Sequence, residues 1–204
     1  MIAAVVPAAG RGSRMGRPKL ALPVGGRPML ERVIAALREG GADPVVVVTG
    51  PHDPALPAIA RAAEAEVCEL AIATPDMRTT VEHGLRWLEE RYHPRPEDAF
   101  LLTPGDLPFL DAATVRAVCE AYAAGSGATI VFPTHGGRRG HPVLIAWRHV
   151  EAIRGLPPGV GIDSYLRDSR DAMREVAAPG ESIRVNVNSP ADLLSAFSAE
   201  EIIR

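Results

Sequence analysis

The stretch that decides the fold is the N-terminal segment Met1-Ile-Ala-Ala-Val-Val-Pro-Ala-Ala-Gly-Arg-Gly-Ser-Arg-Met-Gly-Arg-Pro-Lys19. Its apolar start, Ile2–Val6, predicts a buried strand, and a glycine-rich loop follows that strand directly. Glycines in a loop at the carboxyl edge of a parallel sheet let backbone N–H groups approach a bound anion, because no side chain stands in the way. The arginines and the lysine of the loop add positive charge. The segment therefore predicts a phosphate-binding loop at the edge of an α/β sheet.

Short apolar runs and helical patterns alternate along the following chain. This alternation predicts a mostly parallel, Rossmann-like sheet with helices on both faces, a three-layer α/β/α sandwich formed by one domain over residues 1–204. After about residue 134 the alternation weakens, and we expect that region to carry substrate contacts. The predicted strands are Ile2–Val6, Pro44–Thr49, Val67–Ile72, Ala99–Thr103, Ala128–Phe132 and Pro142–Ala146; the predicted helices are Met29–Arg38, Ala55–Ala65, Thr79–Tyr92, Ala112–Ala123 and one beginning within Ala191–Phe197.

Composition excludes several classes of protein. The 204 residues are 47% hydrophobic and 23% charged, so disorder is excluded, and a net charge of −3 argues against nucleic-acid binding through bulk charge. Acids are nevertheless missing from residues 1–30 and 121–150, which contain basic residues and so favour a small anionic ligand. Cys68 and Cys119 form no CxxC pair, and no apolar run is long enough for a membrane span. We expect a soluble, cytoplasmic protein with buried thiols.

Two common phosphate loops do not fit the glycine-rich segment. The dinucleotide fingerprint GxGxxG would place its third glycine at Met15, and Thr49-Gly50 offers no acid for a ribose hydroxyl. The Walker pattern requires GK[ST], but Lys19 follows Pro18 and precedes Leu20. Dinucleotide-dependent dehydrogenases and P-loop NTPases are therefore excluded.

A carboxylate marks the end of another predicted strand. Asp106 lies in the segment Pro104-Gly-Asp-Leu-Pro-Phe-Leu110, directly after the apolar run Ala99–Thr103. At the carboxyl edge of the sheet this side chain would face anions held by the first loop. A hard cation such as Mg²⁺ needs oxygen ligands at such a place, so Asp106 is a candidate metal ligand.

These segments resemble the motifs of nucleotidyltransferases. Ala8–Pro23 and Gly26–Leu30 are similar to the family's first motif, AAGxGxRMGxPKxLLPxxGxPLL, and Gly105–Leu110 is similar to its metal-binding motif, GDxPxL. Three further segments, Met77–Leu85, Arg138–Pro142 and Asn186–Leu193, resemble GMxxSVxxGL, RGHP and NxNTPxDL of the MobA-like NTP transferase family, the molybdenum cofactor (molybdopterin) cytidylyltransferases and guanylyltransferases.

The resemblance implies a fold like that of nucleotide-diphospho-sugar transferases, with one antiparallel strand late in the sheet. It implies Mg²⁺-dependent transfer of a nucleoside monophosphate from CTP or GTP to a molybdopterin-type acceptor, with release of pyrophosphate. A molybdoenzyme or its chaperone is a candidate partner, and neither nucleic acid nor a membrane is expected. The implied catalytic residues are Arg14, Lys19 and Asp106, the last holding Mg²⁺; nucleotide binding is assigned to Ala8, Ala9, Gly10, Arg11, Gly12, Lys19, Asp76 and Asp106, and acceptor binding to His141, Asn186 and Asn188.

The chain departs from the family pattern at several positions. Asp76 replaces a glycine and Thr80 a serine, while Asn186 and Asn188 stand where cytidylyl members usually carry acids. These asparagines favour GTP, whereas the RGHP segment and the methyl group of Ala9, which narrows the expected base site, favour CTP. We expect CTP to be preferred.

Two other functions stay open. A sugar-phosphate nucleotidyltransferase shares the first motif, although such proteins usually have more residues between the positions of Arg14 and Lys19. A nucleotide-binding accessory protein without turnover is the other alternative. The role of His141 is also open, because this side chain could bind the acceptor or fix the turn that contains it.

Overall fold

The computed structural model describes residues 1–10, 19–125 and 127–187. Its centre is an eight-stranded sheet in the order β10-β7-β9-β6-β1-β4-β5, with β8 paired to β7. Among these strands only β9 and the two-residue β8 run antiparallel to their neighbours, as the expected late antiparallel strand requires. The strands are β1 (Ile2–Ala8), β4 (Val45–Thr49), β5 (Glu66–Glu69), β6 (Ala99–Leu102), β7 (Ile130–His135), β8 (Arg138–Arg139), β9 (Val143–Ala146) and β10 (Met173–Ala177).

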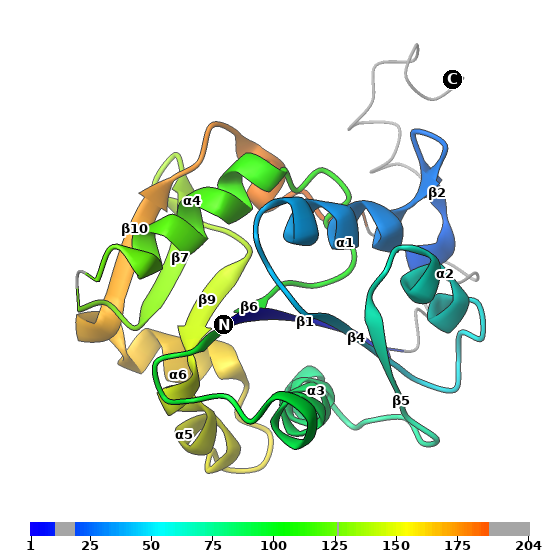
Figure 1. The fold of residues 1–204 in the computed structure, drawn as a ribbon, viewed down its shortest axis with the longest axis horizontal. Coiled ribbons are helices and arrows are strands. Elements are labelled where there is room, and N and C mark those ends of the chain that lie inside the picture. The colour runs from blue at the N-terminus through cyan, green and yellow to red at the C-terminus, as the bar shows by residue number, and fades with distance from the viewer. Residues whose placement is uncertain (11–18, 126, 188–204) are drawn as a thin grey trace.

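Helices cover both faces of the sheet (Figure 1). One face packs against α1 (Met29–Glu39), α2 (Leu56–Ala62) and α4 (Ala112–Ala123), and the other against α3 (Met77–Tyr92), α5 (Val150–Arg154) and α6 (Ile162–Asp168). The three-layer α/β/α sandwich is therefore confirmed. A small hairpin of β2 (Pro23–Val24) and β3 (Arg27–Pro28) and four 3₁₀ turns, η1 (Lys19–Ala21), η2 (Trp147–His149), η3 (Arg170–Ala172) and η4 (Glu181–Ile183), complete the described elements.

Strand β1 lies at the centre of the core. Its side chains alternate between the two helical layers, with Ala4 and Val6 in one apolar cluster and Ala3 and Val5 in the other, all fully buried. Helix α3 approaches this strand closely at Gly84, where an added Cβ would lie 2.8 Å from methyl groups of Val5 and Val48. Glycine at this position lets α3 lie directly on the sheet.

The structure corrects some predicted boundaries. Strand β5 ends at Glu69 rather than Ile72, and β7 begins at Ile130 rather than Ala128. Strand β10 was not predicted, because its sequence Met-Arg-Glu-Val-Ala forms a partly exposed edge without a continuous apolar run. The predicted helix within 191–197 lies outside the described residues.

Two further expectations concern the cysteines and the membrane. Cys68 and Cys119 are free and buried, as expected. No helix in the described ranges combines the length and the apolar character that crossing a bilayer would require.

A partly buried histidine ties α6 to the sheet. The ring of His149 in η2 places Nδ1 2.6 Å from the Tyr165 hydroxyl of α6 and Nε2 2.7 Å from the Thr129 hydroxyl before β7. Burial, and next the nearby Arg148, lower the pKa of His149. The neutral ring, which can donate from one nitrogen and accept at the other, therefore fits this place.

We expect stability to fall as the pH drops from about 7 to about 5, because the unfolded chain takes up a proton near the ordinary histidine pKa of about 6.5, whereas folded His149 resists protonation. His149→Gln should be less stable at neutral pH but should lose less stability over this interval. Urea unfolding at pH 7, 6 and 5 measures the difference, with the exposed His52→Gln as the control. Equal pH dependence in His149→Gln and the wild type would contradict the argument.

Candidate active site

The carboxyl ends of three parallel strands meet at one edge of the sheet. The register pairs Ala8 of β1 with Thr49 of β4 and Val5 of β1 with Leu102 of β6. The segments after these strands therefore lie side by side. At Gly50, after β4, an added Cβ would lie 3.2 Å from the Ala9 methyl group, so glycine lets the two strand ends approach.

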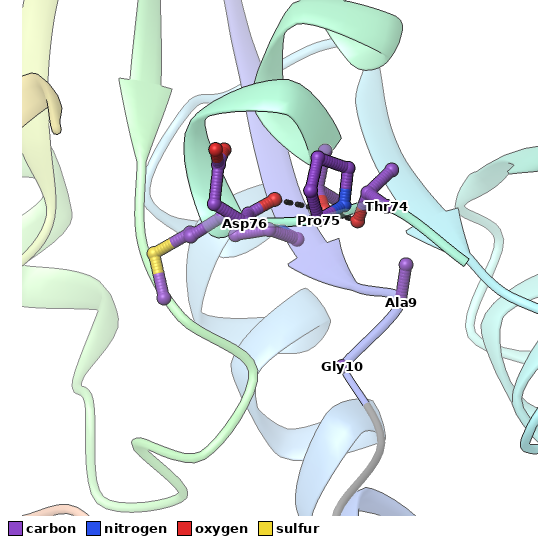
Figure 2. A pocket seen from close by; sticks show the side chains of 8 residues that line it. Ala9, Gly10, Thr74, Pro75 and Asp76 are labelled. Carbon is purple, nitrogen blue, oxygen red and sulfur yellow. Dashed lines mark hydrogen bonds between the residues drawn. The ribbon is translucent and has the colours of Figure 1, made fainter. Parts of the chain in front are cut away.

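A first cavity of about 410 Å³ opens beside the end of β1. Figure 2 shows Ala9 and Gly10 on one side of it and the segment Thr74–Asp76, which leads into α3, on the other. Ala9 is only 4% exposed, whereas Gly10 is exposed and has no atom within 4 Å of the place of a Cβ. The lining residues are Pro7, Ala9, Gly10, Thr74, Pro75, Asp76, Met77 and Thr80.

Hydrogen bonds fix the wall formed by the start of α3. The Asp76 carboxylate caps this helix by accepting from the backbone N–H of Thr79 at 2.7 Å and from its hydroxyl at 2.9 Å. The N–H bond is the main cause that lowers the pKa of Asp76. Thr80 donates to the Asp76 carbonyl at 3.1 Å, and its hydroxyl lies 2.5 Å from that of Thr74. Asp76 and Thr80, the two departures from the family motif, therefore shape this wall.

A second cavity of about 470 Å³ adjoins the first and shares Pro7, Asp76 and Met77 with it. It brings together three predicted site residues from distant parts of the chain, Asp106, His141 and Asn186. The backbone N–H of Val187 donates to the Asp106 carbonyl at 3.1 Å and so holds the segment of Asn186 beside the end of β6. The other lining residues are Arg78, Leu102, Pro104, Gly159, Val160, Gly161, Ile162 and Asp163.

Asp106 forms an ion pair with Lys19. The Lys19 Nζ lies 2.6 Å from Oδ2 of Asp106, and the two side chains are 14% and 19% exposed. The other carboxylate oxygen, Oδ1, is buried and has no hydrogen-bond partner in the described part of the chain. A buried oxygen without a donor is suited to a hard cation.

The number of metal-ligating side chains near Asp106 indicates which kind of cation could bind there. Within the described ranges no cluster of three or more His, Cys, Asp or Glu side chains could hold a metal by itself. Mg²⁺ often binds through one or two carboxylates and takes its remaining oxygens from water and substrate phosphates. Because the carboxylates of this cavity form no such cluster, Asp106 as a lone protein ligand would suit Mg²⁺ better than a metal that is held entirely by protein ligands.

His141 has both a structural contact and a position at the second cavity. Its Nδ1 lies 3.3 Å from the Leu102 carbonyl, which can only accept, so Nδ1 carries the proton. Burial is the main cause that lowers the pKa of His141, and the ring is neutral with Nε2 left as an acceptor. The side chain thus fixes its turn against β6 and also lines the second cavity.

The remaining predicted residues differ in their placement. Ala8 is buried in β1 and is not among the residues that line the two cavities. Arg11, Gly12, Arg14 and Asn188 lie outside the described residues.

Sequence reasoning missed the role of Arg78. Its guanidinium donates to the carbonyls of Leu156 and Pro157 at 2.7 and 3.1 Å. This contact fixes the segment whose residues 159–162 line the second cavity. The only signal in the sequence was its position directly after Met77, in the motif that begins α3.

Comparisons with known proteins identify the family. The MobA-like NTP transferase domain matches residues 4–176. The bifunctional protein GlmU of Sphingopyxis alaskensis is 36% identical over 132 residues, which cover 64% of this chain. The match spans only 28% of that relative's length.

Solved structures share the fold. A nucleotidyl transferase from Methanothermobacter thermautotrophicus is 25% identical with a TM-score of 0.75, covering 96% of this chain and 95% of that one. Rv0371c from Mycobacterium tuberculosis is 23% identical with a TM-score of 0.76, covering 96% and 97% of the two chains. The structure of Rv0371c in complex with manganese is 25% identical in sequence with a TM-score of 0.71, and the match covers 96% of this chain and 99% of that one. The domain match covers most of the chain, and the chain belongs to the MobA-like NTP transferase domain family.

Proposed function

We propose that the chain transfers a nucleoside monophosphate, preferably CMP, from a nucleoside triphosphate to a phosphate-bearing acceptor and releases pyrophosphate. The observation that carries this proposal is the pair of adjoining cavities that share Pro7, Asp76 and Met77, with Asp106 on the second. A transferase for two substrates needs two such sites side by side, with the reacting groups meeting near their common wall.

In the proposed reaction, an oxygen of the acceptor's phosphate attacks the α-phosphorus of the nucleotide. The bond between that phosphorus and the oxygen bridging to the β-phosphorus breaks, and its electron pair leaves with pyrophosphate. Such a transfer depends on in-line positioning and charge neutralisation. The first cavity would hold the base and sugar, while Gly10, Arg11 and Gly12 would surround the triphosphate. Lys19 and Arg14 would neutralise the charge that builds on pyrophosphate.

A divalent cation belongs to this proposal. Asp106 would hold Mg²⁺ through its buried Oδ1, and the ion would supply charge neutralisation for the phosphate oxygens. The manganese complex of Rv0371c supports a divalent cation in this fold. The described residues contain no cluster of three or more His, Cys, Asp or Glu side chains that could hold a metal, so water and the substrate phosphates would complete the coordination.

For the acceptor we propose a molybdopterin-type compound. The second cavity combines apolar residues such as Leu102, Val160 and Ile162 with polar ones, as a ligand with a ring system and a phosphate would require. Its volume of about 470 Å³ also admits a sugar phosphate, which is the second candidate.

The proposal is tested by a matrix of nucleotides and acceptors. Purified protein with Mg²⁺ is given CTP, GTP or UTP together with molybdopterin, a hexose 1-phosphate or no acceptor, and pyrophosphate release is measured. We expect release with CTP and molybdopterin. Release with the hexose phosphate alone would instead favour the sugar-phosphate enzyme, and no release with any acceptor would favour the accessory protein without turnover.

Asp106→Asn should lower kcat at least tenfold, about 1.4 kcal/mol in the barrier, because it removes the charge that would hold the cation. The melting temperature should change little, since the side chain is at a cavity and not in the apolar core. Asp171→Asn, an exposed acid in η3, is the matched control. If Asp106→Asn retained more than a tenth of wild-type turnover, the metal role would be wrong.

The nucleobase preference should depend on Ala9. Its methyl group lines the first cavity and would leave less room for a purine, so CTP should exceed GTP by roughly ten- to a hundredfold. Ala9→Gly should shift the preference toward GTP without changing the KM for the acceptor. Competition between equal CTP and GTP, with products separated by mass, measures this ratio. If most of the wild-type product were guanylylated, the preference for CTP would be contradicted, and Asn186, which favours GTP, would predict the nucleobase better than Ala9.

A further inference from the structure

A third cavity of about 270 Å³ continues from the second on the far side of His141. The second and third cavities share His141 and Asp163, which form the wall between them. The third cavity lies between the β7–β8 hairpin and α6. Its other lining residues are Phe132, Arg139, Gly140, Val143, Leu166, Arg167 and Met173.

The second and third cavities differ in the charge of the side chains around them. The second is lined by Asp76, Asp106 and Asp163, of which Asp106 is paired with Lys19, and by Arg78, which is bound to backbone carbonyls. The third is lined by Arg139, Arg167 and Asp163, the last of which it shares with the second. Among the described residues, carboxylates therefore outnumber cations around the second cavity, and cations outnumber carboxylates around the third.

The two arginines of the third cavity form no ion pair with the described residues. In the described part of the chain neither Arg139 nor Arg167 has a carboxylate oxygen within 4.0 Å, although Asp163 lies one helical turn before Arg167 on α6. The guanidinium of Arg139 lies over the ring of Phe132, 4.5 Å from its centroid. This stacking positions the planar group and leaves its N–H donors at the edge for a ligand.

Close packing holds the position of Arg139. At the next residue, Gly140, an added Cβ would lie 2.5 Å from the side chain of Ile183, so only glycine fits there. The N–H of His141 donates to the Ile183 carbonyl at 2.8 Å, and Arg139 pairs with Thr134 across the hairpin. The wall of the cavity is thus fixed before any ligand binds.

We propose that the third cavity binds a second anionic group of the acceptor, an oxyanion held by Arg139 and Arg167. This inference rests on the proposed function, because it places the acceptor's reacting phosphate in the second cavity and its other anionic end beyond His141. Guanidinium groups bind oxyanions through paired N–H donors. The arginines of the third cavity would orient the acceptor by attracting its far anion, while its reacting phosphate would lie near Asp106 and the proposed cation.

Direct binding of inorganic phosphate tests this subsite without any transfer reaction. Phosphate is titrated into the ¹⁵N-labelled protein with CTP present and divalent cations removed, and the backbone amides of Gly140 and Leu166, which line the cavity, are followed by NMR. Arg139→Gln and Arg167→Gln should each raise the phosphate Kd at least tenfold. Arg138→Gln is the matched control, because this exposed neighbour on β8 is not among the residues that line the cavity.

Acceptor kinetics separate this inference from the proposed function. With a working acceptor, Arg139→Gln and Arg167→Gln should raise the acceptor KM about tenfold and leave the CTP KM unchanged. The subsite would be contradicted if both variants kept the wild-type acceptor KM, or if the phosphate-induced NMR shift changes were the same in both variants as in the wild type. Neither result would count against the transferase activity. Arginine-dependent phosphate binding in a protein that releases no pyrophosphate with any acceptor would count against the transferase and support the anion site.

Discussion

The parallel register of β1 with β4 and β6 is the constraint on which the site depends. Because the three strands run in the same direction, their carboxyl ends reach one edge of the sheet together, and Ala9, Gly50 and Asp106 follow them there. A shift of one residue would exchange the two faces of β1 and turn each side chain toward the opposite helical layer, where it would not match the packing. Burial of β1 on both faces therefore fixes the places of Gly10 and Asp106 at the same time.

Irregular segments and short helices form the remaining walls of the cavities at the strand ends. The start of α3 forms the wall shared by the first two cavities, and Arg78 in its first turn holds the segment that lines the far side of the second. The neutral ring of His141 contacts the Leu102 carbonyl at the end of β6 and lines both the second and the third cavity. The rigid sheet edge is thus common to the family fold, while the side chains that would distinguish one acceptor from another lie on loops and short helices around it.

The parts of the fold that could be predicted are those whose signals are local. Strands β1, β4 and β6 are buried on both faces and appear as continuous apolar runs, so the sequence predicted them within a residue or two. Strand β10 was not predicted because this edge strand, which contains Arg174 and Glu175, has no continuous apolar run. The motifs assigned Asp106 to the metal and nucleotide, and His141 and Asn186 to the acceptor, and the structure places all three at one cavity.

Contacts between distant segments could not be predicted in the same way. The partner of Lys19 is 87 residues away in the sequence, and the carbonyls that bind Arg78 follow it by 78 and 79 residues. Nothing local to Arg139 or Arg167 indicates that they share a cavity, since one lies on β8 and the other on α6. Such pairs depend on the order of strands in the sheet, which the alternation of elements does not determine.

The ion pair between Lys19 and Asp106 has a consequence for the order in which ligands arrive. A divalent cation that entered alone at Oδ1 of Asp106 would lie close to the ammonium group that is paired with Oδ2 at 2.6 Å, and the two positive charges would repel each other. A cation that arrives on a triphosphate brings its own excess of negative charge, toward which the ammonium can turn as it releases the carboxylate. Under the proposed function, the ion pair would therefore disfavour the bare ion, and metal and nucleotide would enter as one complex.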